Sequence, residues 1–323
     1  LLRERPGHLT QLRHPWTVSG ERARRELGFV PRYDSAATVL RASGRDAPAQ
    51  APPRFDDFGL DPAYVAAFGR TLFRFLHDVY WRVELAGLAH LPRTGRAVLA
   101  GTHRGFMPFD GVMALYAVHR VTGRIPRFLI HPTLVKLPFL ANFMTRLGGI
   151  HACRENAARV LEADEILGIF PEGIRGAFAL YRDAYRLRRF GRDDYVKLAI
   201  RHRSPIVPFV TVGSAEIFPI FKKLRWRWWR RWSEWPCLPL TPTFPWLPPV
   251  PLPSKWHTRF LPPLHVEERY PPEAAEDPEV VRAVSGEVRR RMEQALAEIL
   301  ARRRSIFFGT VFEDREELEE EPA

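Results

Sequence analysis

Apolar and polar positions alternate along this chain in two rhythms, which predict strands and helices in turn. Short runs that are apolar at nearly every position alternate with stretches whose apolar residues recur every three to four positions. Short, uniformly apolar runs are typical of strands buried on both faces. The predicted strands are 82–86, 97–101, 126–130, 148–152, 165–170, 205–212 and 254–261. One predicted helix begins at Asp110, and further helices are predicted at 154–163, 192–202 and 287–304. This order predicts an α/β fold in which helices cover a mixed sheet.

An amphipathic helix is expected before the first strand. Asp61 has the residue type of an N-cap, and Pro62 suits the first helical position. The apolar stripe of this helix consists of Val65, Phe68, Leu72, Leu76, Val79 and Val83. Such a stripe either packs on a core or lies on a membrane surface, and both interpretations remain open.

The segment 218–253 differs in kind from the rest of the chain. Residues 221–232 hold six Lys or Arg and four Trp, and a proline-rich run follows. On a helix, Phe221, Leu224, Trp228 and Trp232 would share one face opposite the cations. Trp and Arg both favour the membrane interface. We therefore expect a membrane-facing segment, with a Trp-rich surface that caps the fold as the alternative. The expected membrane contacts are Trp226, Trp228, Trp229 and Trp232.

Composition narrows the classes of partner. The 323 residues, 46% of them hydrophobic, can bury one large core or two modest ones. The net charge is +12, and residues 313–323 contribute −6, so the remainder carries +18. A body this basic favours a polyanion: an anionic membrane, a phosphorylated small molecule or a nucleic acid. Two cysteines exclude a disulfide scaffold and a multi-cysteine zinc site, and they indicate a reducing compartment. No apolar run reaches the ~18 residues that span a bilayer.

The first candidate site is the stretch 101–110, where a strand ends and His103 follows at once. Ligands usually bind at the carboxyl ends of strands in α/β sheets. A histidine can act as a base near neutral pH, and a carboxylate such as Asp110 can hold its tautomer. Without further context, His103 could be a loop histidine and Asp110 a helix N-cap.

The second candidate site is the stretch 170–176, directly after a buried strand. Gly173 and Gly176 allow a ligand to approach the backbone closely. Arg175 offers a planar fork that matches phosphate, and Glu172 can hold that arginine or accept a hydrogen bond from a hydroxyl. Arg154 is expected to be either a second cation near the site or a solvated residue in the first turn of a helix. A tight turn with a surface ion pair is the alternative, and Cys153 and His151 are expected to be structural.

The order of these pieces resembles the four-block pattern of the phospholipid/glycerol acyltransferase superfamily, above all the 1-acylglycerol-3-phosphate acyltransferases. The blocks are His103 to Asp110, Gly149 to Arg154, Phe170 to Gly176, and Pro205 to Phe209, within a resemblance that covers about residues 60–312. The resemblance implies the glycerolipid acyltransferase fold and a mechanism without an acyl-enzyme.

The resemblance also assigns roles to the candidate residues. His103 is the base, and Asp110 orients it. Arg175, with Arg154, holds an acceptor phosphate, while Glu172 and Gly173 bind the glycerol portion. The donor is acyl-coenzyme A or acyl-acyl carrier protein, and no cofactor or metal is needed.

Two departures from the family pattern bear on the acceptor. Six residues separate His103 from Asp110 where four are usual, and Pro108 stands at the usual position of the acid. This spacing resembles a branch of the superfamily whose acceptors include neutral glycerides. Ile174 replaces the usual Thr or Ser beside Arg175. A lysophospholipid and a neutral mono- or diacylglycerol therefore both remain open as acceptors.

The N-terminal stretch has a separate resemblance. Residues 18–33 resemble the closing segment of extended short-chain dehydrogenases/epimerases. The chain contains neither a Gly-x-Gly-x-x-Gly motif nor a Tyr-x-x-x-Lys pair, which argues against dinucleotide binding of that type. We expect a remnant or the trailing end of a fusion, with a basic arm as the alternative. The predicted organisation is an arm at 1–45, a linker at 46–55, an acyltransferase domain at 56–312 and a disordered acidic tail at 313–323.

Taken together, the residues predict a membrane-associated O-acyltransferase, peripheral at the cytoplasmic face, without a transmembrane helix. Its expected partners are a glycerolipid acceptor, an acyl thioester donor, an anionic membrane and an acyl carrier protein, with no nucleic acid. The alternatives are a catalytically silent lipid-binding scaffold and a binder of single-stranded nucleic acid. His103 and Arg175 argue against the scaffold. An apolar face opposite the cations favours a membrane over a nucleic acid.

Overall fold

The computed structural model describes the region that carries the predicted sites. The described residues are Arg24, Arg25, Gly28, 55–132, 134, 138–187, 190, 193–226, 235–247 and 250–313. The predicted arm, linker and acidic tail fall almost entirely outside them. The boundaries drawn for those segments therefore stay predictions.

The strands of the described region form one mixed sheet and a separate two-stranded ribbon. The order in the sheet is β1-β9-β6-β2-β5-β3-β4, and β9 pairs with β6 in antiparallel fashion while the other neighbours are parallel. The strands are β1 Glu84–Ala86, β2 Ala97–Gly101, β3 Arg127–Ile130, β4 Ile150–His151, β5 Ile166–Ile169, β6 Ile206–Val212 and β9 His257–Phe260. Each predicted strand is present, β2 with the predicted bounds and the others shorter at one or both ends, which confirms the mixed α/β fold.

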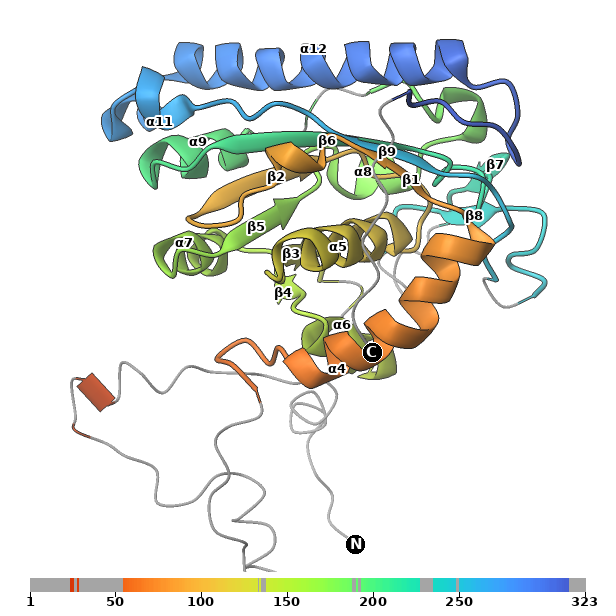
Figure 1. Cartoon of the computed structure of the whole chain (residues 1–323), viewed down its shortest axis with the longest axis horizontal. Helices are drawn as coiled ribbons and strands as arrows, with labels where there is room; N and C mark the ends of the chain where they lie inside the picture. Colours follow the sequence, from red (N-terminus) through yellow and green to blue (C-terminus); the bar gives the residue numbers. More distant parts are fainter. Residues whose placement is uncertain are drawn as a thin grey trace, which may run out of the picture.

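Helices cover both faces of this sheet, and each face has its own hydrophobic cluster. Val98 and Ala100 of β2 point to one cluster and Leu99 to the other, as the two-residue period of a strand requires. The first cluster includes α7 Arg154–Glu162, α9 Asp194–Arg201 and the long α12 Pro278–Arg302, which lies across the top in Figure 1. The second includes α5 Phe109–Thr122 and the N-terminal helix.

The N-terminal helix begins as predicted and then changes its winding. Asp61 caps α4 Pro62–Phe68 by accepting from the Tyr64 N–H. The chain continues as π-helix in η1 Gly69–Phe73 and η2 Phe75–Tyr80. A π-helix has more residues in each turn than an α-helix, so the buried positions no longer recur every 3.6 residues. The predicted stripe is therefore wrong in part: Leu72 is 42% exposed and Val79 59%.

The segment after β6 also differs from the prediction. The common face considered for Phe221 and Leu224 required a helix, but the chain forms β7 Lys222–Leu224, paired antiparallel with β8 Leu238–Leu240. The partner strand satisfies the backbone groups that a helix would have bonded locally. Residues 227–234 of the Trp/Arg segment lie outside the described residues.

Further elements connect these layers. They are η3 Leu88–His90, α6 Pro138–Arg146, α8 Gly173–Ala177, η5 Tyr181–Asp183, α11 Val266–Arg269 and η6 Pro272–Glu276. The last helix, α12, starts earlier than predicted because Asp277 caps it, accepting from the N–H groups of Glu279 and Val280. Among the described residues, no helix combines the length and the hydrophobicity needed to cross a bilayer.

Candidate functional site

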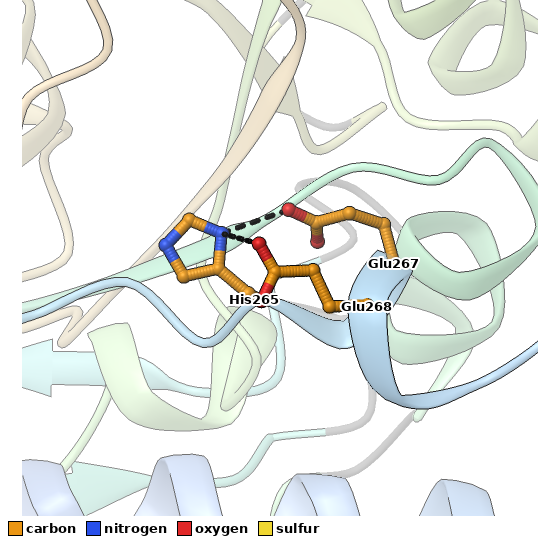
Figure 2. Close-up of side chains that lie close together, drawn as sticks. All are labelled: His265, Glu267 and Glu268. Atoms are coloured by element: carbon orange, nitrogen blue, oxygen red, sulfur yellow. Dashed lines mark hydrogen bonds and ion pairs between the residues drawn. The ribbon is translucent and has the colours of Figure 1, made fainter.

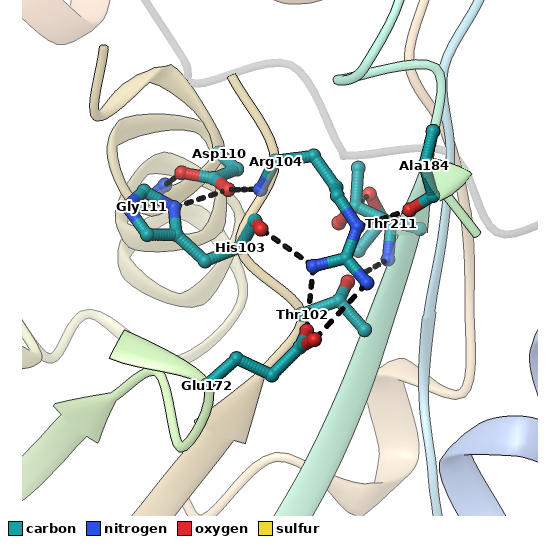
Figure 3. A network of polar contacts seen from close by, with 9 residues as sticks. Thr102, His103, Arg104, Asp110, Gly111, Glu172, Ala184 and Thr211 are labelled. Atoms are coloured by element: carbon teal, nitrogen blue, oxygen red, sulfur yellow. Dashed lines mark hydrogen bonds and ion pairs between the residues drawn. The ribbon is translucent and has the colours of Figure 1, made fainter. Parts of the chain in front are cut away.

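The candidate residues lie where adjacent parallel strands end. β2 pairs with β5 in the register that places Ala100 beside Ile169. His103 and Glu172 each come three residues after that pair, so both lie at the same edge of the sheet (Figure 3). This edge is where ligands bind in open α/β sheets. The topology therefore brings the two predicted sites together.

His103 and Asp110 form a direct pair. Asp110 lies in the first turn of α5 and is 1% exposed. Its Oδ2 accepts from His103 Nδ1 at 2.8 Å and from the Arg104 backbone N–H at 2.9 Å, while Oδ1 accepts from the Gly111 N–H at 2.8 Å. A carboxylate only accepts, so Nδ1 carries the ring proton and Nε2 presents a lone pair. No other described residue forms a hydrogen bond with that Nε2.

The six residues between His103 and Asp110, two more than is usual in the family, form a loop that packs on aromatic side chains. Gly105 has φ +76°, a left-handed conformation that favours glycine. Phe106 is 4% exposed, and its ring centroid lies 4.9 Å from that of Phe218. The loop is anchored by this ring, and Asp110 still reaches the imidazole.

An aromatic platform supports the imidazole. The ring of Phe170, the first residue of the second motif, stacks on His103 at 4.5 Å between centroids and 21° between planes. Phe128 stacks behind Phe170 at 5.5 Å. A Cβ at Gly168 would lie 2.6 Å from the Phe128 ring, so only glycine fits there. Phe170 was included in the second motif but was assigned no role from the sequence, because nothing in the local pattern indicates a contact with His103.

Glu172 does not stand alone at the edge. It is 4% exposed, and its carboxylate pairs with the guanidinium of Arg104, with 2.5 Å between Arg104 Nη1 and Glu172 Oε2 (Figure 3). Sequence reasoning also missed Arg104. Its partner is 68 residues away in the chain, and no local spacing could mark such a pair.

Arg175 and Gly173 lie on the short helix α8 beside this pair. Gly173 has φ +55°, and a Cβ there would contact nothing within 4 Å, so the backbone at this point is open to a ligand. Arg175 is exposed, and among the described residues it takes part in no hydrogen bond or ion pair. Its guanidinium is therefore available to an anion.

Arg154 faces a different set of residues. It begins α7 and is 73% exposed, and its Nη2 lies 2.7 Å from Asp194 Oδ1 of α9. Both residues line an open groove of about 280 Å³ between α7 and α9. None of the contacts of Arg154 reaches His103 or Glu172. Cys153, expected to be structural, caps α7 through Sγ, which accepts from the Asn156 N–H.

The predicted membrane contacts fall mostly outside the described residues. Trp226 follows β7 and is 45% exposed. Trp228, Trp229 and Trp232 lie in the part of the chain that the structure does not describe.

One group of side chains has the composition of a metal site. His265, Glu267 and Glu268 place their ligand atoms within 4.8 Å of one another, and His265 Nδ1 lies 2.8 Å from Glu267 Oε1 (Figure 2). The group precedes and begins α11, beyond Leu264, which bridges to Ile206 at the start of β6. It therefore lies at the sheet edge opposite to His103. His265 and Glu268 are exposed, and His265 Nδ1 lies within ion-pair distance of both carboxylates without a metal.

A histidine–aspartate pair beside a buried arginine–glutamate pair, all at the carboxyl edge of an α/β sheet, is the arrangement of a candidate acid–base active site. A family model described as acyltransferase matches residues 82–212, which contain both pairs. Uncharacterized proteins of Mycobacterium tuberculosis and Mycobacterium leprae are 38% and 39% identical over 258 residues, covering 79% of this chain and 72% and 70% of theirs. This chain belongs to the acyltransferase family.

Two more distant proteins also resemble this chain. A bovine protein named DGAT1/2-independent enzyme synthesizing storage lipids is 28% identical over 145 residues, which is 44% of this chain and 42% of the relative. The crystal structure of the 1-acyl-sn-glycerophosphate (LPA) acyltransferase PlsC from Thermotoga maritima superposes with a TM-score of 0.51 at 17% identity. That match covers 76% of this chain and 81% of the other, and it confirms the predicted fold. Together these findings support a glycerolipid acyltransferase.

Proposed function

We propose that this protein transfers a fatty acyl group from an acyl thioester to a hydroxyl of a glycerol-based acceptor at a membrane surface. His103 Nε2 takes the proton of the acceptor hydroxyl, and the oxygen attacks the thioester carbonyl. The tetrahedral intermediate collapses, the C–S bond breaks, and the thiolate leaves with the proton from the imidazolium. Asp110 stabilises that imidazolium, as a buried carboxylate does in hydrolase triads.

The observation that carries this proposal is the His103–Asp110 pair, since a buried carboxylate at 2.8 Å sets the tautomer that leaves Nε2 as the base. The test is thiol release from palmitoyl-coenzyme A in the presence of an acceptor, by wild type and by His103→Ala. His265→Ala, at the opposite edge of the sheet, is the matched control. We expect release that depends on acceptor and is lost only in His103→Ala. Full turnover by His103→Ala would refute the mechanism.

The acceptor is proposed to be a lysophospholipid of the lysophosphatidate type, because Arg175 is exposed next to the Glu172 turn and forms no hydrogen bond or ion pair with the other described residues. A charged hydrogen bond of this kind contributes about 1.5–3 kcal/mol, or roughly 10- to 150-fold in affinity. Arg175→Ala should raise the KM for lysophosphatidic acid by about that factor and leave the KM for monoacylglycerol unchanged. Arg182→Ala, whose side chain is 81% exposed on η5, is the control.

A neutral glyceride is the second candidate acceptor. The six-residue spacing between His103 and Asp110 supports it, as does the name of the bovine relative, which refers to storage lipids. Equal effects of Arg175→Ala on both acceptors would favour this alternative and remove the phosphate role.

A contiguous apolar surface supports attachment to a membrane. The end of η2 and two distant loops meet there: Tyr80 donates to Pro251 O at 2.7 Å, and Arg82 donates to Phe307 O at 2.7 Å. The exposed apolar side chains of these segments are Phe75, Val79, Val250, Phe307 and Phe308. Exposed Arg70 and Arg74 on the same helix add positive charge. Such a combination favours an anionic leaflet.

Vesicle sedimentation tests this surface. Phe307→Ser combined with Phe308→Ser should release the protein from phosphatidylglycerol vesicles, and Trp226→Ser should weaken the same binding. Phe139→Ser, at a side chain that is 93% exposed on α6, should bind as wild type does. Unchanged binding of the Phe307 and Phe308 variant would contradict the assignment of the surface.

A further inference from the structure

Arg104 uses its whole guanidinium inside the protein. Nε donates to Ala184 O, Nη1 donates to His103 O at 2.7 Å and to Glu172 Oε2 at 2.5 Å, and Nη2 donates to Glu172 Oε1 and Arg186 O at 3.4 and 3.3 Å. These contacts match the five N–H donors of an arginine. The side chains of Arg104 and Glu172 are 2% and 1% exposed.

The Arg104–Glu172 pair is hydrogen-bonded to the backbone of His103, the proposed base. Arg104 Nη1 joins the carboxylate of Glu172 to the carbonyl of His103, and the Arg104 backbone N–H donates to the same Asp110 Oδ2 that accepts from His103 Nδ1 (Figure 3). The position of the His103–Arg104 peptide therefore determines both hydrogen bonds to Asp110. A shift of that peptide would change the hold of Asp110 on the imidazole.

Gly176 packs closely against the Arg104–Glu172 pair and the backbone of His103. A Cβ at this position would lie 2.8 Å from Glu172 Cβ, 3.1 Å from His103 O and 3.3 Å from Arg104 Nη1. Gly176 is thus in van der Waals contact with both the Arg104–Glu172 pair and the backbone of His103. The close approach explains glycine here, since the backbone of α8 at Gly176 has no positive φ.

We propose that the Arg104–Glu172 pair is a positioning device that sets the orientation of His103 through its backbone, and that Glu172 acts on Arg104 and not on the acceptor. This inference rests on the proposed role of His103 as the base. A buried ion pair contributes little to stability compared with apolar residues of the same volume, so stability alone does not account for it. Lysine could not replace Arg104, because an ammonium group has three donors and no planar fork.

The central test compares single and paired substitutions. Arg104→Met and Glu172→Met should each lower the melting temperature, because each leaves one buried charge without its partner. The combined variant removes both charges and should recover most of that loss. Its kcat should nevertheless stay about 10- to 100-fold below wild type, with the KM for acceptor within about threefold, because the backbone of His103 is no longer held. Recovery of kcat together with the melting temperature would overturn the proposal.

Two further variants keep the test decisive if the paired substitution fails to fold. Glu172→Gln should lower kcat, and a raised KM for acceptor at unchanged kcat would instead place Glu172 on the acceptor and overturn the proposal. Gly176→Ala crowds the pair without removing a charge and should also lower kcat. Gly286→Ala on α12, where a Cβ would lie 3.6 Å from Arg290 Nη1, is the matched glycine control and should retain wild-type kcat.

A measurement without substrate separates this proposal from the proposed function. Histidine ¹⁵N shifts, assigned with His103→Ala, report which ring nitrogen of His103 carries the proton. In wild type we expect the proton on Nδ1, and in the paired variant or Gly176→Ala a population with the proton on Nε2. If wild type transfers no acyl group, the proposed function fails, and this readout still decides the role of the pair. An unchanged tautomer in the variants would overturn it.

Discussion

Replacing Asp110 by Asn keeps the shape of the side chain but removes one of its two acceptor oxygens and its negative charge. Three N–H groups, those of His103 Nδ1, Arg104 and Gly111, donate to its two carboxylate oxygens. An amide offers one oxygen and one NH₂ group. In either orientation at least one donor faces another donor, and the negative charge beside the imidazole is lost.

The two orientations of the amide have different consequences. If its oxygen stays with Gly111, the NH₂ group faces His103, which must place its proton on Nε2 and can no longer act as a base. If its oxygen faces His103, the buried Gly111 N–H loses its acceptor. A buried unsatisfied donor costs about 1–3 kcal/mol of stability. In Ser-His-Asp triads the same substitution lowers kcat about 10,000-fold, which corresponds to about 5.4 kcal/mol of transition-state stabilisation.

We therefore expect Asp110→Asn to fold with a modestly lower melting temperature and to lose about three to four orders of magnitude in kcat. The assay is acceptor-dependent thiol release, with circular dichroism to confirm the fold. Asp78→Asn is the matched control, because Asp78 also bonds a histidine, His77, at 2.7 Å but has a side chain that is 46% exposed. If Asp110→Asn retains kcat within tenfold of wild type, Asp110 does not orient the base.

Three further predictions test the framework around the site. Cys153→Ser should keep kcat within about twofold by initial-rate assay, because serine is a good N-cap and the mechanism uses no thiol; a tenfold loss would indicate an acyl-cysteine. Glu84→Gln should speed amide exchange at Val311 and Phe312, whose N–H groups donate to the Glu84 carboxylate, and not at Met292 within α12. Gly101→Ala should lower the unfolding free energy by about 1–3 kcal/mol in denaturant titration, because overpacking is destabilising. Its Cβ would overlap the Phe209 ring, so Phe209→Leu should recover part of that loss.

Local sequence patterns were sufficient to predict the elements with a clear hydrophobic pattern. The apolar runs at 97–101, 165–170 and 205–212 became β2, β5 and β6, because strands buried on both faces leave a uniform apolar signature. Two patterns were misleading. The stripe through Leu72 and Val79 assumed α-helical winding, and π-helix turned those side chains to solvent. The face that Phe221 and Leu224 would share on a helix does not form, because residues 222–224 are β7, whose partner β8 lies on the far side of the Trp/Arg run.

In the candidate site, too, the sequence predicted the residue types, whereas several of their contacts could be found only in the structure. His103, Asp110 and Glu172 were predicted to act at one site, on residue type and on the order of the motifs. Neither the contact between Asp110 and His103 across a longer loop nor the engagement of Glu172 by Arg104 follows from spacing. Arg154 was expected beside Arg175, and its guanidinium pairs with Asp194 instead.

The sequence by itself determined the α/β class, the strands that carry the site and the chemical types gathered at their ends. These are local properties, since burial on both faces dictates apolar runs and catalysis at neutral pH dictates a histidine near a carboxylate. Only the tertiary structure decided which side chains meet. The parallel register of β2 and β5 aligns residues 69 positions apart, Ala100 with Ile169, and thereby places Arg104 against Glu172. Contacts of that kind depend on strand order, which no local periodicity encodes.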